Sequence, residues 1–189
     1  MTTAIMIIAY HFVFTTYGTW LPNDPRGSYS KVVYDAEVKA LGDSHYGRQD
    51  REPDADTLRK FWTAARRTLK RPQFFIDDSK REIIAEGFAQ VVRRLGLTVR
   101  ACAIMNDHVH LLTSRSKHRI EYVIGQFKGG ATRALGLSQT PWTKGAWKVF
   151  IVDEETLASA ARYIERNPIE AGRPPQQWSF VTPLSSFCE

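Results

Sequence analysis

Apolar runs separated by turn residues recur along this chain and predict a set of buried strands. Residues 4–15, AIMIIAYHFVFT, are rich in isoleucine, valine and aromatic side chains and end shortly before Gly18, which is typical of a buried strand. The Asn106-Asp107 pair predicts a tight turn that joins two further strands into a hairpin. The further predicted strands are 97–105, 108–113 and 149–153.

Helical periodicity fills the intervals between these strands. Ser79 followed by Glu82 predicts a capping-box start, and apolar residues then recur at helical spacing until Gly96 ends the helix. These apolar residues are Ile83, Ile84, Phe88, Val91, Val92 and Leu95. Three other helices are predicted: a basic amphipathic helix over 57–70, one over 119–135 that contains Gly129-Gly130, and one over 154–166 that stops at Asn167-Pro168.

The order of these elements predicts an α+β fold. A strand–helix–strand unit repeats around the central hairpin, which is typical of a ferredoxin-like antiparallel sheet with helices on one face. The helix over 154–166 is an addition to that plan and carries Tyr163. We expect a single domain over 1–189, with a short C-terminal arm over 173–189.

A loop insertion near 17–56 interrupts this plan after the first strand. Pro22, Pro25 and Gly27 force turns there, whereas Tyr17, Trp20 and Tyr29 indicate that the loop is ordered. The polar residues over 42–56 are expected to be mobile, and nothing in their pattern assigns them a role.

The composition of the 189-residue chain excludes several classes of protein. It is 43% hydrophobic and 24% charged, unlike disordered, collagen-like or membrane-bundle proteins. The apolar run over 4–14 has no basic residue before it, no cleavage site after it, and is too short to span a membrane. Cys102 and Cys188 form neither a disulfide framework nor a metal-ligand spacing, so we expect a reducing, cytoplasmic setting.

Positive charge is concentrated between residues 115 and 148. Seven basic residues lie there against one acid, Glu121, so this segment alone holds a charge equal to the net +6 of the chain. A basic stretch with interleaved aromatic rings suits a polyanion whose bases can stack, so nucleic acid is the expected partner, although a solvated basic face would have the same composition. The candidate DNA-binding residues are Arg115, Lys117, Arg119, Lys128, Arg133, Lys144, Trp147 and Lys148, with Trp142 as either a stacking or a core residue.

His108 and His110 are the first candidates for chemistry. Residues i and i+2 of a strand point to the same face, so both imidazoles would lie side by side with Cα atoms roughly 7 Å apart, close enough to share one metal ion. Val109 and Leu111 would then face the core. The alternative is a pair of polar residues on a solvated strand face. His11 and His118 stand alone in the sequence and are expected to be hydrogen-bonded or surface residues.

Tyr163 and Asn167 are one helical turn apart on the last predicted helix. A tyrosine oxygen is a poor nucleophile at an ordinary pKa of about 10, so it needs an electrophile activated by a metal. The Asn167 carbonyl oxygen could complete a coordination shell with the histidines, since oxygen ligands suit Mg²⁺ or Mn²⁺. The alternative is an ordinary buried tyrosine, and an asparagine that ends a helix before proline.

Three segments together resemble a known family. FVFTTYGTWLPNDPRGS, AIMNDHVHLL and YIERNPIEAG, in that order, are similar to the single-tyrosine HUH transposases, especially their REP-associated branch, over about residues 5–172. The histidine–hydrophobe–histidine motif corresponds to His108-Val109-His110, and the tyrosine motif to Tyr163, Ile164, Asn167 and Pro168.

The resemblance implies a ferredoxin-like fold and an enzyme that nicks and rejoins single-stranded DNA near hairpin or palindromic repeats. Tyr163 would form a covalent 5′-phosphotyrosine and leave a free 3′-hydroxyl, with Mg²⁺ or Mn²⁺ as Lewis acid on His108, His110 and Asn167. Related insertion-sequence transposases have a glutamine in place of Asn167. They act as dimers, while the REP-associated branch is thought to act as monomers, so a homodimer stays open.

Two other functions fit parts of the pattern. The runner-up is a non-catalytic, domesticated module that only binds DNA hairpins, and it would not need His108, His110 and Tyr163 together. An RNA phosphoesterase that uses two histidines would need a second His-x-Thr or His-x-Ser element, which the sequence lacks.

Overall fold

The computed structural model describes residues 6–28, 30–48 and 51–184. The start of the first predicted strand at 4–5, Tyr29, part of the polar segment over 42–56, and Cys188 lie outside the described residues. The chain divides into two compact units. We call Met1–Thr15 with Ile76–Glu189 the sheet unit, and Thr16–Phe75 the inserted unit.

Within its described residues, the sheet unit is built on a four-stranded sheet of order β4-β5-β1-β6. The strands are β1 (Ala9–Thr15), β4 (Val99–Ile104), β5 (His108–Ser114) and β6 (Trp147–Ile151), and each neighbouring pair is antiparallel. The helices are α3 (Asp78–Leu95), α4 (Ile120–Ala134) and α5 (Glu154–Glu170). This order of strands around the β4–β5 hairpin confirms the predicted ferredoxin-like α+β fold.

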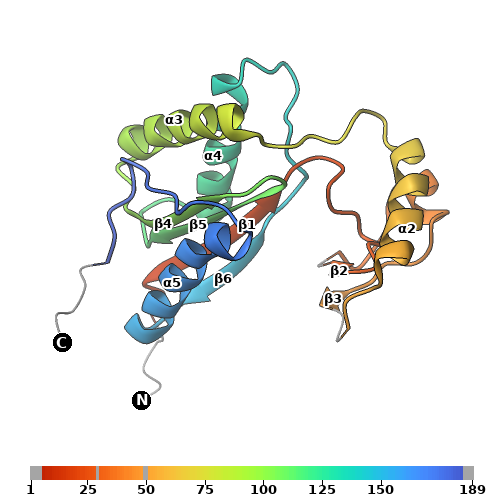
Figure 1. The fold of residues 1–189 in the computed structure, drawn as a ribbon. Helices are drawn as coiled ribbons and strands as arrows, with labels where there is room; N and C mark the ends of the chain where they lie inside the picture. Colours follow the sequence, from red (N-terminus) through yellow and green to blue (C-terminus); the bar gives the residue numbers. More distant parts are fainter. Residues whose placement is uncertain (1–5, 29, 49–50, 185–189) are drawn as a thin grey trace. The chain divides into compact units, whose positions relative to one another are not determined.

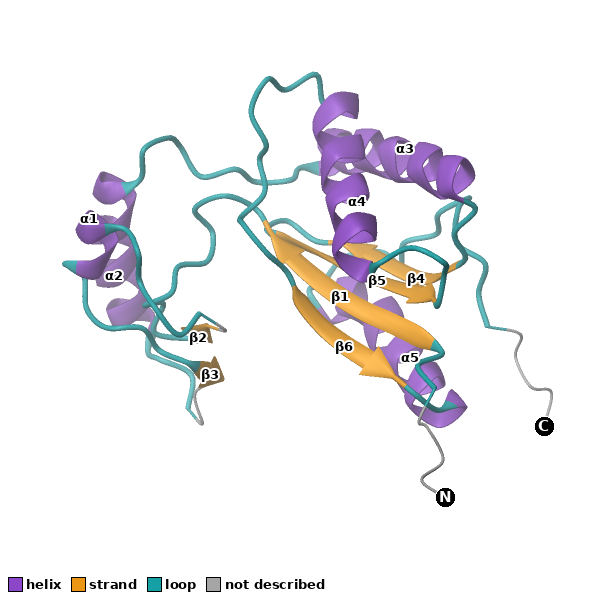
Figure 2. Ribbon diagram, turned by 180° about the vertical axis from the view of Figure 1, so that it is seen from behind, coloured by secondary structure: helices purple, strands orange, loops and turns teal. Residues whose placement is uncertain are grey.

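Alternation along β1 creates a different core on each face of the sheet. Phe12 and Phe14 are buried on one face, where they pack against Phe127 of α4 and Phe88 of α3. The opposite face packs against α5 through a separate cluster that includes Ala9, Leu112 and Ile164. Figures 1 and 2 show α3 and α4 on one side of the sheet and α5 on the other. The tyrosine-bearing helix is therefore an addition to the two-helix layer, as predicted.

Two glycines let α3 and α4 approach closely. A Cβ atom on Gly87 would lie 2.9 Å from the Gly130 carbonyl oxygen, and one on Gly130 would lie 2.6 Å from a methyl carbon of Val91. The Gly129-Gly130 pair therefore does not break α4. Gly130 is required by the packing, which outweighs its low helix propensity.

Two predicted helix ends are wrong. Asp77 rather than Ser79 caps α3, since its side chain accepts the backbone N–H of Lys80 at 2.9 Å. At its other end α3 stops at Gly96 in the left-handed conformation, as predicted. Helix α5 continues through Pro168 to Glu170, one turn beyond the predicted stop, and Pro168 is buried.

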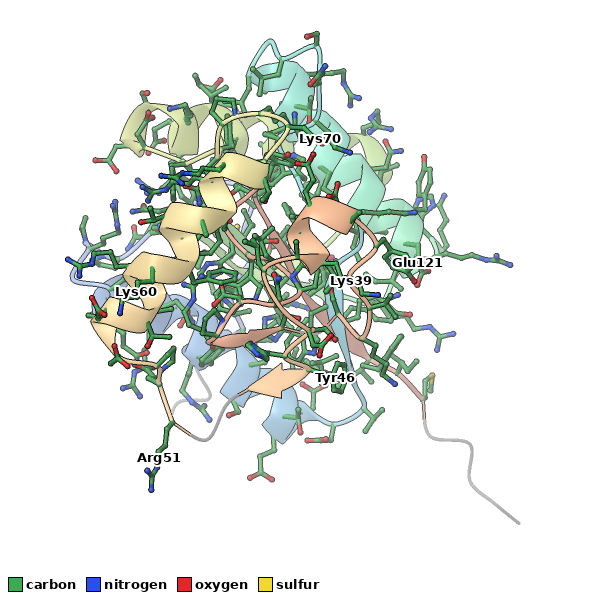
Figure 3. The ribbon with its side chains drawn as sticks, turned by 90° about the vertical axis from the view of Figure 1, so that its right-hand side faces the viewer. Lys39, Tyr46, Arg51, Lys60, Lys70 and Glu121 are labelled. Carbon is green, nitrogen blue, oxygen red and sulfur yellow. The ribbon has the colours of Figure 1, made fainter. Side chains whose placement is uncertain are left out.

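The inserted unit contains β2 (Gly27–Ser28), α1 (Ala36–Lys39), β3 (Gly47–Arg48) and α2 (Ala55–Thr68). Its small core consists of Leu21, Val38 and Ala65, with Phe61, Trp62 and other partly buried residues packed around it. Because α2 supplies much of this core, the unit extends to residue 75, beyond the insertion expected near 17–56. Figure 3 shows Lys60 on α2 and Lys70 just past its C-terminal end.

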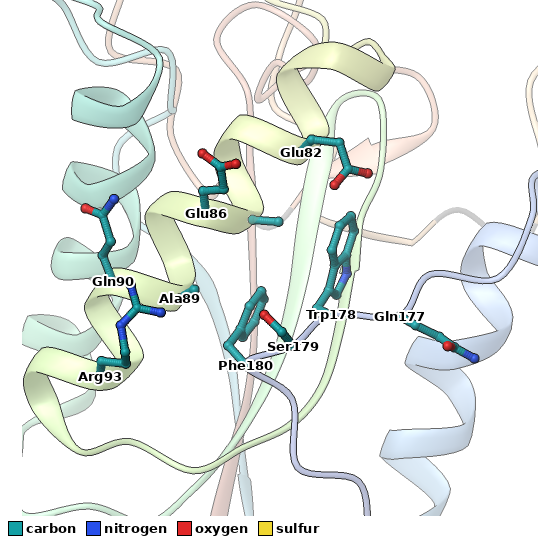
Figure 4. Close-up of a pocket in the computed structure, with 10 residues that line it drawn as sticks. Glu82, Glu86, Ala89, Gln90, Arg93, Gln177, Trp178, Ser179 and Phe180 are labelled. Carbon is teal, nitrogen blue, oxygen red and sulfur yellow. The ribbon is translucent and has the colours of Figure 1, made fainter.

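The C-terminal segment covers the outer edge of β4. The Gln176 side chain donates to the Ile104 carbonyl at 2.9 Å and accepts from the Ile104 N–H at 2.8 Å, while the Thr182 N–H donates to the Val99 carbonyl at 2.8 Å. Figure 4 shows Trp178 and Phe180 beside α3, across a groove lined by Glu82 and Glu86. This segment protects an edge strand that would otherwise present unpaired backbone groups.

No helix in the part of the chain that the structure describes has the length and apolar character needed to cross a membrane.

Candidate active site

The two histidines of β5 lie on the face of the sheet that packs against α5. Val109, which lies between the histidines, and Leu111, which follows them, are fully buried on the opposite face. This confirms the alternation predicted for this strand. The imidazole centroids of His108 and His110 are 4.9 Å apart at an angle of 77°. The pair is therefore a local consequence of strand geometry.

Asp107 fixes the orientation of the His108 ring. His108 Nδ1 lies 2.6 Å from Asp107 Oδ1, and an ionised carboxylate can only accept a hydrogen bond. In the neutral ring this contact places the proton of His108 on Nδ1 and the lone pair on Nε2. A carboxylate that holds Nδ1–H in this way is a common support for a metal-ligating histidine.

His11 of β1 contacts His110 on the same face of the sheet, and we call His11, His108 and His110 the histidine row. His11 Nε2 and His110 Nδ1 share a hydrogen bond at 3.1 Å, and both residues are buried, at 5% and 6% exposure. Burial lowers the pKa of His11 to about 4. Burial, followed by the neighbouring His108 and His11, lowers the pKa of His110 to about 2. Both imidazoles are therefore neutral at neutral pH, which is the form that binds metals.

Tyr163 of α5 lies over this row of histidines. Its ring centroid is 5.6 Å from that of His110 and 6.2 Å from that of His11, in edge-on arrangements. Trp147 of β6 makes a similar edge-on contact with His11 at 5.4 Å. Tyr163 is nevertheless 51% exposed, so it is not the ordinary buried tyrosine of the alternative interpretation. Strand β5 and helix α5 thus bring the two sequence motifs together within one chain.

Asn167 follows Tyr163 by one turn of α5 and is hydrogen-bonded to it. The Asn167 Nδ2 donates to the Tyr163 carbonyl oxygen at 2.7 Å. Because that bond uses the amide nitrogen, the Oδ1 oxygen is the atom of this side chain with ligand character. Asn167 precedes Pro168, a position that ordinarily disfavours helix, and its side chain braces the turn.

The donor set on this face suits a divalent cation of the Mg²⁺ or Mn²⁺ class only in part. Among the residues that the structure describes, no group of three or more His, Cys, Asp or Glu side chains is arranged to hold a metal ion. His108 and His110 each have Nδ1 in a hydrogen bond, so Nε2 is the ring atom of each that could ligate a metal. Two such nitrogens and one amide oxygen would leave most of a six-fold shell to water and phosphate.

The predicted DNA-binding residues do not share one face. Lys148 pairs with Phe12 across the β1–β6 ladder and contacts Glu121 of α4 at 2.5 Å, so it lies on the face away from the histidines. Trp147 lies on the histidine face and is 38% exposed. Five other members are exposed or partly exposed: Arg115, Lys117, Arg119, Arg133 and Lys144. Their role in DNA binding stays a prediction.

Lys128 and Trp142 have structural partners. The Lys128 amine donates to the Thr143 carbonyl at 2.9 Å and also to the Gly145 carbonyl. The Trp142 indole N–H donates to the Lys128 carbonyl at 3.0 Å, and its ring packs on Phe14 in the core. Trp142 is therefore a core residue, and Lys128 holds the loop that precedes β6.

His11 and Asp107 are the site residues that the sequence did not assign. His11 was expected to be hydrogen-bonded or on the surface, and its partner proves to be one of the paired histidines. The signal for His11 is its place as a polar residue inside a buried strand. It alternates with Phe12 and Phe14, so it lies on the same face of the strand as Ala9 and Val13. The signal for Asp107 is a carboxylate directly before His108, within the predicted turn.

Comparisons with known proteins give this chain a family and structural neighbours. A family model described as "Transposase IS200 like" matches residues 65–167, which include both histidines and Tyr163. A solved structure of a REP-associated tyrosine transposase bound to a REP hairpin has a TM-score of 0.51 and 12% identity, covering 95% of this chain and 79% of that one. A transposase structure from Deinococcus radiodurans has a TM-score of 0.38 and 16% identity, covering 88% and 95%. None of the curated proteins matches the chain.

Proposed function

Because the chain belongs to the IS200-like transposase family, we propose that it nicks and rejoins single-stranded DNA through a covalent bond between Tyr163 and a 5′ phosphate. The observation that carries this proposal is the position of the Tyr163 ring over the histidine row of the same chain. A half-exposed tyrosine on a rigid helix can be reached by a DNA strand, and the helix limits the geometries in which it meets a phosphate.

The reaction exchanges one phosphodiester bond for another. The Tyr163 oxygen loses its proton and bonds to phosphorus, the bond from phosphorus to the 3′ oxygen breaks, and that oxygen takes up a proton to become a free 3′-hydroxyl. The reverse reaction, with a 3′-hydroxyl as nucleophile, rejoins a strand and releases Tyr163. Since the phosphotyrosine conserves the bond energy, no external energy source is needed.

His108, His110 and Asn167 are the residues proposed to hold Mg²⁺ or Mn²⁺. When bound, such an ion supplies Lewis-acid polarisation of the scissile phosphate. The residues of the chain orient the ligands: Asp107 holds the ring of His108, and the turn of α5 places Asn167 beside Tyr163. The burial of His110 keeps it neutral and prevents it from repelling a cation.

The proposed substrate is DNA that carries a hairpin or palindromic repeat beside the cleaved strand. The relative of similar fold was solved with a REP hairpin, which supports this class of partner. Tyr163 contacts histidines of its own chain, so we propose that one protomer contains a complete site and that a homodimer is not required for cleavage.

The experiment is incubation of labelled single-stranded DNA that carries a hairpin with the full chain and Mn²⁺, followed by denaturing electrophoresis. We expect a protein–DNA adduct with wild type and with Tyr122→Phe, a change at another exposed tyrosine of the sheet unit. Tyr163→Phe should bind DNA but form no adduct. A wild-type protein that binds hairpins without forming an adduct would instead support the non-catalytic binding module.

A further inference from the structure

The contact between His11 and His110 constrains where the proton of His110 lies. Two imidazole nitrogens 3.1 Å apart share one hydrogen bond, so one of them carries the proton and the other offers a lone pair. If His11 donated, His110 would carry its own proton on Nε2 and could not ligate a metal through that atom. If His11 accepts, His110 is protonated on Nδ1 and its Nε2 lone pair is free.

The register of β1 against β5 brings His11 and His110 into contact. On β1, His11 pairs with Leu112, and on β5, His110 pairs with Val13, so the two histidines are diagonal neighbours on one face. Their rings stack at 5.4 Å with an interplanar angle of 27°. Trp147 makes an edge-on contact with His11 at 5.4 Å, and His11 is only 5% exposed. His11 therefore has little freedom to choose another partner.

We propose that His11 is a positioning residue that accepts the Nδ1–H of His110 and thereby presents the His110 Nε2 lone pair to the metal ion. The inference rests on the proposed function, because it assigns a role toward the metal of that site. Asp107 has the same relation to His108. The two ligands are thus held in one tautomer by different acceptors, a carboxylate at the exposed end and a neutral imidazole at the buried end.

The first test observes the tautomer without metal or DNA. Long-range ¹H–¹⁵N correlation spectra of the full chain, labelled at histidine, distinguish protonated from unprotonated ring nitrogens. We expect His110 to be protonated on Nδ1 in wild type and to lose this preference in His11→Phe. A wild-type His110 protonated on Nε2 overturns the proposal.

The second test measures Mn²⁺ binding to the full chain by the loss of the free-ion EPR signal. His11→Phe should weaken binding by roughly tenfold, the lower end of the effect of removing such a support. His11→Gln should restore part of the affinity, because an amide oxygen can accept from Nδ1–H. His118→Phe is the matched control, since His118 lies at the start of α4 against Tyr122, and it should bind like wild type.

The outcomes separate this inference from the proposed function. Equal Mn²⁺ affinity in wild type and His11→Phe, with adduct formation intact in wild type, would overturn the role of His11 alone. A wild type that neither binds Mn²⁺ nor forms the adduct would overturn the proposed function, and the spectra would still decide the tautomer. Thermal unfolding of each variant shows whether a weaker affinity comes from the fold instead.

A second, independent observation concerns the charge on the inserted unit. Between residues 57 and 75 there are six basic residues and no acid, whereas residues 16–56 hold eight acids and five basic residues. Five of the six are exposed and recur at helical spacing along and just beyond α2; we call them the α2 stripe: Arg59, Lys60, Arg66, Arg67 and Lys70. The opposite side of α2 is committed to the core of the unit through Ala65, Phe61 and Trp62.

We propose that the α2 stripe binds the phosphate backbone of the DNA substrate. Its arginine content suits phosphate, and the apolar residues Phe61 and Trp62 of α2 pack against the core of the unit. Asp56 pairs with Arg59 and Lys60, and Asp35 with Lys70, whereas Arg66 donates to the neutral amide of Gln73. The positive charge in the last turn of α2 is therefore the part of the stripe that these carboxylates neutralise least. This inference also rests on the proposed function.

The test compares two pairs of arginines in the same helical position. Arg66 and Arg67 lie in the last turn of α2, and Arg93 and Arg94 lie in the last turn of α3. Changing the first pair to glutamine should lower the slope of log affinity against log salt for a hairpin oligonucleotide by roughly 0.7–0.9 for each phosphate that the protein no longer neutralises. Changing the second pair to glutamine should leave the slope unchanged.

Equal slopes for the two double variants would overturn this proposal. So would weaker binding to anionic phospholipid vesicles without a change in the DNA slope, since the partner would then be a membrane. Adduct formation on the hairpin oligonucleotide, at low salt and saturating protein, should persist in the α2 variant. Its absence in wild type would instead overturn the proposed function.

Discussion

The amine of Lys128 offers a test of whether a basic residue of 115–148 stabilises the protein rather than binds DNA. Lys128→Met keeps most of the side-chain length on α4 and removes the donor to the Thr143 and Gly145 carbonyls. A hydrogen bond from a charged donor contributes roughly 1.5–3 kcal/mol in a protected setting. Gly145 is exposed and its carbonyl can bond to water, and burial disfavours the ammonium, so we expect a net destabilisation of about 1–2 kcal/mol.

The pH dependence of this difference has a definite sign. Burial lowers the pKa of Lys128 from its ordinary 10.5 to about 8. Between these two pH values Lys128 is protonated in the unfolded chain and deprotonated in the folded chain. Its contribution to the free energy of unfolding therefore increases as the pH rises. Wild type should therefore become more stable relative to Lys128→Met as pH rises from about 8 toward 10.5.

Thermal unfolding of both proteins at several pH values measures these effects. We expect Lys128→Met to lower the Tm by roughly 2–8 °C at pH 7. The control is Lys144→Met, at an exposed position in the same loop, and its stability should lie within about 0.5 kcal/mol of wild type. The salt slope of DNA binding should change little. An unchanged Tm together with a slope lowered by about 0.7 would refute the reasoning, because Lys128 would then be free to contact phosphate.

Three further predictions concern the site and the helix packing. Changing both His108 and His110 to alanine should leave the Tm near that of wild type and abolish the adduct in Mg²⁺; nicking at the wild-type rate would exclude the metal assignment. Gly87→Ala should destabilise the protein by roughly 1–3 kcal/mol in denaturant unfolding, because its Cβ would meet the Gly130 carbonyl at 2.9 Å. Gly125→Ala, which meets nothing within 4 Å, should be neutral or stabilising by up to about 1 kcal/mol, and an equal destabilisation at both glycines would show that close packing is not the cause.

The fold could be predicted because its strands and helices follow local periodicity. The alternation in HVHLL places Val109 and Leu111 on one face of the sheet and the two histidines on the other, and the structure confirms this division. The errors at helix ends have local causes that periodicity does not contain. Asp77 competes with Ser79 as the cap, and the Asn167 side chain braces a turn that Pro168 was expected to end.

The extent of the inserted unit was less accessible from the sequence. The short helix α1 has four residues, too few for a periodic signal, and its start depends on the Asp35 side chain, which accepts two backbone N–H groups. The basic helix was predicted at nearly its observed position, but its packing against Leu21 and Val38 depends on contacts between distant residues.

The candidate site shows the same limit. His108 and His110 are related by a local rule, and Tyr163 by its motif, so each could be identified from the sequence. The contact between His11 and His110 joins residues 99 positions apart and depends on the register of β1 against β5. A one-residue shift in that register would place His11 on the opposite face. No local pattern specifies such a register.

The measurement that tests the central claim most directly is mass spectrometry of the trapped protein–DNA adduct. Wild-type protein is incubated with a hairpin oligonucleotide and Mn²⁺, digested, and its modified peptide sequenced. We predict one nucleotide-bearing residue, Tyr163, joined to the 5′ phosphate on the downstream side of the nick, and no modified peptide from Tyr163→Phe. A nucleotide on any other tyrosine, or cleavage that persists in Tyr163→Phe, would contradict the proposed mechanism.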